Sequence, residues 1–75
     1  MGGYVVIQVD SEREDIYISK VFDTKEEAKA MLKELYSFAT LGQTFLIETR
    51  RVNDNRFYVR FTNGEACYAE IRKLG

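Results

Sequence analysis

The segment RFYVRFTNG, residues 56–64, combines residue types that bind other molecules. Arginine holds phosphates and carboxylates through paired hydrogen bonds, and tyrosine stacks on bases or anchors protein interfaces. Because side chains alternate along a strand, the arginines and the apolar residues here are expected on opposite faces. The predicted inward set is Phe57, Val59 and Phe61, and the predicted outward set is Arg56, Tyr58, Arg60 and Thr62.

The same alternation in residues 44–52 and 65–74 extends both sets. It predicts that Phe45, Ile47, Cys67, Ala69 and Ile71 point inward. The candidate partner-binding site on the outward face is Arg50, Arg56, Tyr58, Arg60, Tyr68 and Arg72, with Glu48 and Glu70 between the arginines.

Three interpretations of this face remain open. The first is a solvated sheet face, on which each cross-strand side-chain pair stabilises the fold by roughly 0.2–1 kcal/mol. The second is a protein interface, and the third is a surface that binds nucleic acid. The residues YVRF (58–61) match the end of the RNA-recognition strand pattern, but DNR stands where its glycine-containing half belongs. An RNA-recognition domain also needs two helices, whereas this sequence predicts one.

Other chemistry has little support in the sequence. The chain has no histidine, which is the most frequent general base and metal ligand. Cys67 has no basic neighbour in the sequence to activate it, so it is expected to pack as a small apolar residue. We therefore predict no catalytic residue, no metal site and no cofactor, and expect a protein that is not an enzyme.

Two charged segments are alternative contact sites. Asp10, Glu12, Glu14 and Asp15 lie in or beside a polar turn and lack the spacing of a calcium loop. Lys25, Lys29 and Lys33 recur every four residues and form a stripe on a helix. Both segments are interpreted as solvated surfaces, with contact to a partner as the alternative.

The hydrophobic pattern predicts the elements that carry these residues. Residues 4–10 and 16–22 form a hairpin, and residues 44–52, 56–62 and 65–74 form three further strands. Ile16 and Ile18 are expected to point inward. In the first strand Val5, Ile7 and Val9 share one face, which leaves Tyr4 and Val6, together with Tyr17, to extend the outer face.

Residues 23–42 change to a helical period. Thr24 and Glu27 are spaced as a capping box, and Gly42 is placed to end the helix in a left-handed conformation. The expected apolar stripe is Ala28, Met31, Leu32, Leu35, Phe38 and Ala39. Asn63 and Gly64 predict a type I′ hairpin turn.

The predicted fold is α+β with two layers, an antiparallel sheet of about five strands with one helix on one face, in the order ββαβββ. The 75 residues form one domain, 1–75. A net charge of −1 provides no overall basic field. The absence of a long apolar run and of a signal-peptide pattern predicts no membrane contact, and a single cysteine agrees with a cytoplasmic location.

Several short segments resemble small phage-encoded inhibitors, in particular a type I-F anti-CRISPR family with a helix on a five-stranded sheet. They are YVV (4–6), SERE (11–14), AK in the helix, GQT (42–44), IET (47–49), the aromatic fourth strand and the NG turn. The resemblance implies a stoichiometric inhibitor that binds a CRISPR surveillance complex and blocks target DNA. It transfers no site, because the family's basic contact residues do not match this chain one by one.

The expected function is that of a small binding protein with a protein partner, and its expected origin is a phage or mobile element. Nucleic-acid binding through the same face is the first alternative, and a homodimeric structural protein is the second. The sequence leaves open whether the chain is a monomer or a homodimer.

Overall fold

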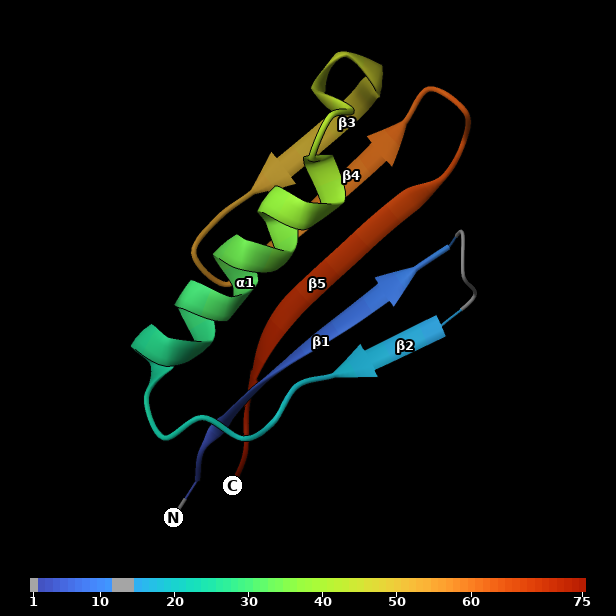
Figure 1. Cartoon of the computed structure of the whole chain (residues 1–75). Helices are drawn as coiled ribbons and strands as arrows, with labels where there is room; N and C mark the ends of the chain where they lie inside the picture. Colours follow the sequence, from blue (N-terminus) through green and yellow to red (C-terminus); the bar gives the residue numbers. More distant parts are fainter. Residues whose placement is uncertain (1, 12–14) are drawn as a thin grey trace.

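The computed structural model describes residues 2–11 and 15–75, except for the side chain of Asp15. Five strands form one sheet, and one helix lies on one of its faces (Figure 1). The elements are β1 (Tyr4–Asp10), β2 (Asp15–Ile18), α1 (Lys25–Thr40), the 3-10 helix η1 (Thr44–Leu46), β3 (Ile47–Val52), β4 (Arg56–Phe61) and β5 (Ala66–Lys73). This arrangement confirms the predicted α+β class.

All neighbouring strands are antiparallel, in the order β2-β1-β5-β4-β3. The first and last strands of the chain pair at the centre of the sheet, which brings the two termini to the same end of the molecule (Figure 1). Short turns join β3 to β4 and β4 to β5. The edges of the sheet are therefore β2 and β3.

The core lies between α1 and the sheet. Its buried residues are Val6, Ala28, Leu32, Phe57, Val59, Phe61, Cys67 and Ala69. Tyr36 of α1 adds an edge-to-face contact with the ring of Phe57, with centroids 5.4 Å apart. The predicted inward residues of β4 and β5 are thus confirmed, with Ile71 packed against the cluster.

Local signals fix both ends of α1. The Thr24 hydroxyl accepts a hydrogen bond from the Glu27 amide, and the Glu27 carboxylate accepts one from the Thr24 amide. This capping box was predicted. Gly42 follows the helix with a φ of +71°, also as predicted, because glycine enters the left-handed region without a Cβ clash.

The face assignment predicted for the first hairpin was wrong. Val6 is fully buried opposite Ile71, and Tyr4 packs against the core, so they belong to the helix side. Val5, Ile7 and Val9 occupy the opposite face. Apart from Asp10, the residues of β1 include one polar side chain, Gln8, so both faces of the strand are apolar. The pairing of β1 with β5 decides which face meets the helix.

The register of β1 also determines the orientation of β2. Because directly paired residues point to the same face, Ile18 follows Ile7 and Ile16 follows Val9 away from the helix. The two isoleucine side chains are 62% and 65% exposed, which overturns the prediction that they point inward. Tyr17 is on the helix side rather than on the outer face.

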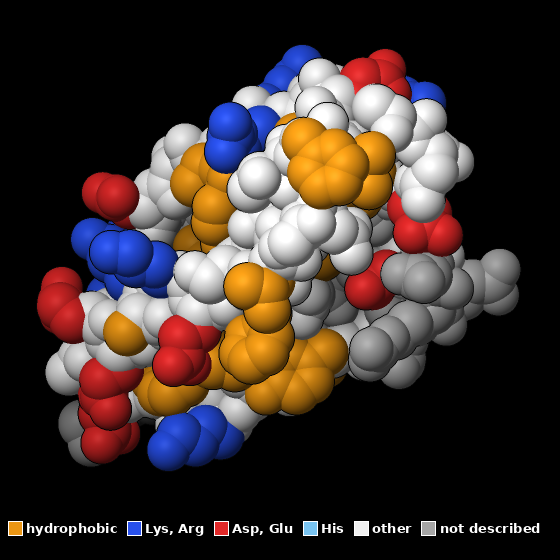
Figure 2. All heavy atoms as spheres, turned by 45° about the horizontal axis from the view of Figure 1, so that its top comes forward, with side chains coloured by type: hydrophobic (Ala, Val, Ile, Leu, Met, Phe, Trp, Pro, Cys, Tyr) orange, Lys and Arg blue, Asp and Glu red, His pale blue; other side chains and the backbone are white. Residues whose placement is uncertain are grey.

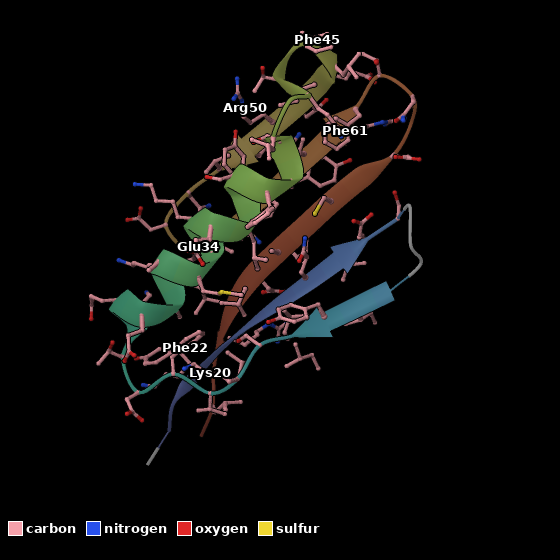
Figure 3. All side chains as sticks on the ribbon, in the orientation of Figure 1. Lys20, Phe22, Glu34, Phe45, Arg50 and Phe61 are labelled. Atoms are coloured by element: carbon pink, nitrogen blue, oxygen red, sulfur yellow. The ribbon has the colours of Figure 1, made fainter. Side chains whose placement is uncertain are left out.

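A β-bulge overturns the prediction for Arg50. Ile47 pairs with Phe61, but Thr49 pairs with Arg60, so β3 contains one extra residue between them. From that point the alternation is reversed, and Arg50 pairs with the buried Val59 on the helix side. Its guanidinium donates to the hydroxyl of Tyr36 at 3.0 Å, beside α1 (Figure 3).

Two predicted core aromatics lie outside the core. Phe45 belongs to η1, not to a strand, and is 80% exposed beyond the end of the helix (Figure 3). Phe38 is 76% exposed on α1, and Tyr36 packs against the core instead. The hydrophobic spacing of the helix allowed either aromatic to face the sheet.

The turn after β4 is longer than predicted. The Gly64 amide donates to the Phe61 carbonyl, and the Phe61 amide donates to the Glu65 carbonyl. Thr62 and Asn63 are therefore the central residues of the first turn, and Gly64 follows with a φ of +91°. This pattern fits a three-residue loop with a glycine bulge rather than a two-residue type I′ turn.

Candidate protein interface on the outer sheet face

The sheet face opposite α1 carries a continuous apolar row across four strands. The registers place Ile16 beside Val9, Val9 beside Tyr68, and Tyr68 beside Tyr58. Neighbouring strands lie about 4.8 Å apart, so four adjacent side chains extend over roughly 15 Å. Within the described chain, α1 packs on the other face, so no helix covers this row.

A second row widens the apolar surface at the β2 end. Ile18 pairs with Ile7, and Ile7 pairs with Glu70. Ile16, Ile18 and Val9 are exposed, and Ile7 is half-buried. Four aliphatic side chains thus adjoin the two tyrosines. We call these six residues, Ile7, Val9, Ile16, Ile18, Tyr58 and Tyr68, the outer apolar patch.

Arginines border the patch on the side of β4 and β3. Arg56 and Arg60 flank Tyr58 along β4, Arg72 lies on β5, and Arg51 pairs with Tyr58 across the strands. Together with Asn53, Arg51 and Arg56 line a shallow depression of about 410 Å³ over the two tyrosines. Five of the six predicted site residues therefore share this face, and Arg51 replaces Arg50.

Two acids lie among the arginines. Arg72 Nη2 donates a hydrogen bond to Glu70 Oε1 at 3.2 Å, and the ion pair between Arg72 Nε and Glu70 Oε2 measures 2.9 Å. A Glu48 carboxylate oxygen lies 3.9 Å from the Arg60 Nε. Hydrogen bonding from Arg72, followed by the charge of Arg72, a hydrogen bond with Tyr68 and the charge of Arg56, holds the pKa of Glu70 below its ordinary value. The pKa of Arg72 is raised in turn, mainly by that same hydrogen bond.

Sequence reasoning missed the aliphatic half of this surface. Ile7, Val9, Ile16 and Ile18 were assigned to the core, since alternation reveals that two faces exist but not which one a helix covers. A signal was nevertheless present. The segment YVVIQV is apolar on both faces, which is typical of a strand with an apolar surface on each side.

The structure places two lysines of the helix stripe beside a groove, and it describes only part of the acidic turn. Lys29 and Lys33 border a groove of about 480 Å³ between α1 and the β3–β4 turn, whose floor includes Leu32 and Phe57. Of the acidic turn, Glu12 and Glu14 lie outside the described residues. In the described part of the chain, no group of three histidine, cysteine or acidic residues is arranged to hold a metal ion.

The Cys67 thiol is buried under α1, in surroundings that disfavour the reactive thiolate form. Burial raises its pKa, an effect only partly offset by the hydrogen bond that the Gln8 amide donates at 3.1 Å. A neutral buried thiol is inert compared with an activated thiolate. Cys67 is thus part of the packed core, as predicted.

Comparisons with known proteins add no family assignment. No protein-family model, curated protein or solved structure matches the chain. The resemblance to phage-encoded inhibitors remains a prediction. Among residues 2–11 and 15–75, no helix has the length and apolar character needed to span a bilayer.

Proposed function

We propose that this chain is a non-enzymatic intracellular binding protein and that its outer sheet face docks a partner protein. The observation that carries the proposal is the outer apolar patch, which extends across four strands without a covering helix. Contiguous exposed apolar surface with a polar rim is the usual composition of a protein interface. Tyrosine and arginine are also enriched among the residues that dominate binding energy.

The charges at the rim indicate the partner's chemistry. Four arginines and two glutamates border the patch, which leaves an excess of positive charge. A complementary partner therefore presents apolar side chains with carboxylates around them. A stoichiometric inhibitor that occupies a site on a larger complex, as the phage resemblance implies, would bind in this way.

Protein binding is favoured over nucleic-acid binding by the apolar half of the face. Lysine and arginine side chains supply most of the affinity for phosphates, whereas Ile16, Ile18 and Val9 carry no charge and no hydrogen-bond donor. Two of the arginines, Arg60 and Arg72, are also ion-paired with carboxylates on the same face. A salt series discriminates further, because phosphate-dominated affinity falls steeply with ionic strength and apolar anchoring changes little.

Photocrosslinking identifies the partner and tests the face in one experiment. A benzoylphenylalanine introduced at Tyr58 is expected to capture one dominant protein in the source cells, whereas the same group at Phe45 captures none. Phe45 is a matched control, because it is an exposed aromatic residue in η1 and is not part of the patch. Equal capture at both positions would count against the proposed face.

Affinity measurements with the purified partner test the individual residues. Tyr58→Ala, Ile16→Ser and Arg60→Glu are each expected to weaken binding at least about tenfold, while Phe45→Ala leaves it unchanged. None of these side chains belongs to the core, so all four variants should remain folded by circular dichroism. Normal binding by all three patch variants would place the interface elsewhere.

A further inference from the structure

A groove runs along the flank of α1 that faces the β3–β4 turn. It has a volume of about 480 Å³ and is open along one side. The structure describes every residue that lines it, together with the chain neighbours of each. The lining residues come from α1, β3, β4 and the β3–β4 turn, and they are Lys29, Leu32, Lys33, Tyr36, Val52, Asn53, Asp54 and Phe57.

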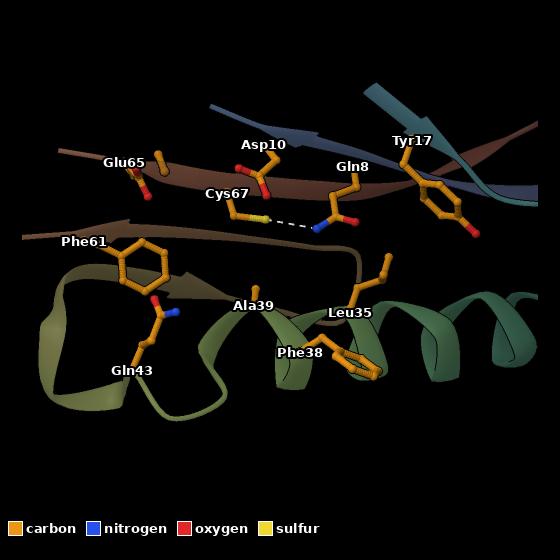
Figure 4. A pocket seen from close by; sticks show the side chains of 11 residues that line it. Gln8, Asp10, Tyr17, Leu35, Phe38, Ala39, Gln43, Phe61, Glu65 and Cys67 are labelled. Atoms are coloured by element: carbon orange, nitrogen blue, oxygen red, sulfur yellow. Dashed lines mark hydrogen bonds between the residues drawn. The ribbon is translucent and has the colours of Figure 1, made fainter. Parts of the chain in front are cut away.

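The position of α1 on the sheet leaves this flank open. Five strands at about 4.8 Å spacing measure roughly 19 Å across, whereas a helix with its side chains is about 10–12 Å wide. The helix packs mainly on β5 and β1, where Leu35 and Ala39 face Cys67 (Figure 4). It contacts β4 less, and β3 lies beyond β4 at the sheet edge (Figure 1). The helix side of β3 therefore has room for a second helix beside α1.

The floor and the outer wall of the groove are apolar. Leu32 and Phe57 belong to the core, and the half-buried ring of Tyr36 packs edge to face against Phe57. Val52, at the end of β3, is 54% exposed. Its pairing with Phe57 places Val52 on the helix side of the sheet, beside the groove. Apolar side chains of a partner would remove Val52 and Tyr36 from water, which favours binding.

Basic side chains stand along the rim of the groove. Lys29 and Lys33 lie about one turn apart on α1. The guanidinium of Arg50 continues this row, because it donates to the Tyr36 hydroxyl at 3.0 Å. Asp54 contributes one negative charge from the β3–β4 turn, so positive charge is in excess. In Figure 2, which views the helix side, apolar side chains show between basic ones on the left of the molecule.

We propose that this groove docks an acidic amphipathic helix of a partner protein, alongside α1. The apolar face of that helix contacts Leu32, Tyr36 and Val52. Glutamates four residues apart along its flank are separated by about 6 Å, the same rise as between Lys29 and Lys33, so each meets one lysine. Packed helices lie about 8–10 Å apart, which is about two strand spacings, so the partner helix covers β4 and β3.

This is the helix-in-groove mode of peptide recognition. It goes beyond the binding proposed for the outer apolar patch, because the two surfaces lie on opposite faces of the sheet. It also assigns a role to the lysine stripe, which the sequence leaves as a solvated face or a partner contact.

A stapled peptide provides the probe, because a short helix alone is only marginally stable in water. The peptide has 16 residues, the length of α1, with leucines on one face and glutamates four apart along one flank of that face. It is titrated into the isotope-labelled full chain, and backbone amide shifts are followed by NMR. The largest shifts are expected at Lys29, Lys33, Tyr36, Val52 and Asp54.

A second peptide of the same composition controls for general attraction. Its glutamates stand on the face opposite the leucines, where they cannot reach the lysines while the leucines occupy the groove. We expect it to bind about fivefold more weakly at low salt, and the difference should shrink as salt screens the charges.

Variants of the chain test the two parts of the groove. The double variant Lys29→Gln with Lys33→Gln and the single variant Val52→Ser are each expected to weaken binding about fivefold. Glutamine is a good helix former and Val52 lies outside the buried core, so both variants should fold. The matched control, Lys20→Gln with Lys73→Gln, removes the same charge from exposed lysines outside the groove and should change the affinity less than about twofold.

Four results would overturn the proposal. They are no detectable binding of the peptide, wild-type affinity in both groove variants, an equal loss in the lysine control, or equal binding of the second peptide. Shifts concentrated on the outer apolar patch, with loss of binding in Tyr58→Ala, would likewise assign the peptide to that patch. The outcome is separate from that of the crosslinking experiment, since a partner captured at Tyr58 does not depend on this groove.

Discussion

Glu70 is a residue whose titration reports on the outer face. Its carboxylate is held by Arg72 at 2.9 Å and lies near the charge of Arg56, so its pKa is below the ordinary value. We expect an NMR titration of the folded chain to show this lowered midpoint. In Arg72→Ala the midpoint should rise towards the ordinary value, and an unchanged midpoint would mean that the ion pair is absent in solution.

The same shift predicts the sign of a small stability effect. Because the pKa is lowered in the folded state, the unfolded chain binds the proton more tightly. The interaction therefore stabilises the fold above the unfolded-state pKa of Glu70 and is lost as the pH falls through the folded pKa. Glu70 and Arg72 are close to solvent, so we expect the effect to be modest and reduced by salt.

For Arg50 and Arg51, strand periodicity did not predict which face of the sheet each side chain occupies. Strand periodicity assigns alternate residues correctly along β4 and β5, where pairing is regular. In β3 one extra residue exchanges the faces of the two arginines, and no local composition signal in IETRR marks it. The bulge depends on contacts with β4, which lies further along the chain.

At the scale of elements, the end of β2 depends on one buried hydroxyl. The Ser19 hydroxyl accepts a hydrogen bond from the Val6 amide at 2.8 Å and donates to the Lys20 carbonyl at 2.8 Å. It thus takes the place of a strand carbonyl where β2 stops. The chain then continues to Phe22, which pairs with Tyr4 in an isolated bridge.

We expect Ser19→Ala to lower the free energy of unfolding by about 1–3 kcal/mol, because it leaves the buried Val6 amide without its partner. Urea denaturation measures the change. Ser37→Ala is the control, since Ser37 is exposed on α1 and the same substitution there should change stability by no more than about 0.5 kcal/mol. Equal effects at both positions would contradict the role assigned to the hydroxyl.

The elements themselves were largely predictable, because their signals are local. The capping box, Gly42 and the alternation in β4 each act within a few residues, and each appears in the structure. The orientation of the first hairpin was not predictable. An apolar strand such as β1 can present either face to a helix, and the choice is made by its pairing with β5, about 60 residues away.

At the scale of the whole molecule, the helix covers only one of the two faces of the sheet. One helix buries the middle of one sheet face, while the other face has no helix in the described chain. The five-strand width leaves the β1–β2 hairpin with exposed apolar side chains on both faces. In the described chain, apolar side chains of the hairpin are therefore exposed on both faces of the sheet.

Solvent accessibility of the methyl groups tests the central claim, that the outer apolar patch is open to a partner. A soluble gadolinium chelate should strongly relax the methyl signals of Ile16, Ile18 and Val9 in the monomeric chain. The methyl signals of Val6 and Val59, which are buried under α1, should be almost unaffected. Protected signals from Ile16 and Ile18, or a light-scattering mass twice 8.7 kDa, would instead mean that the patch is already covered.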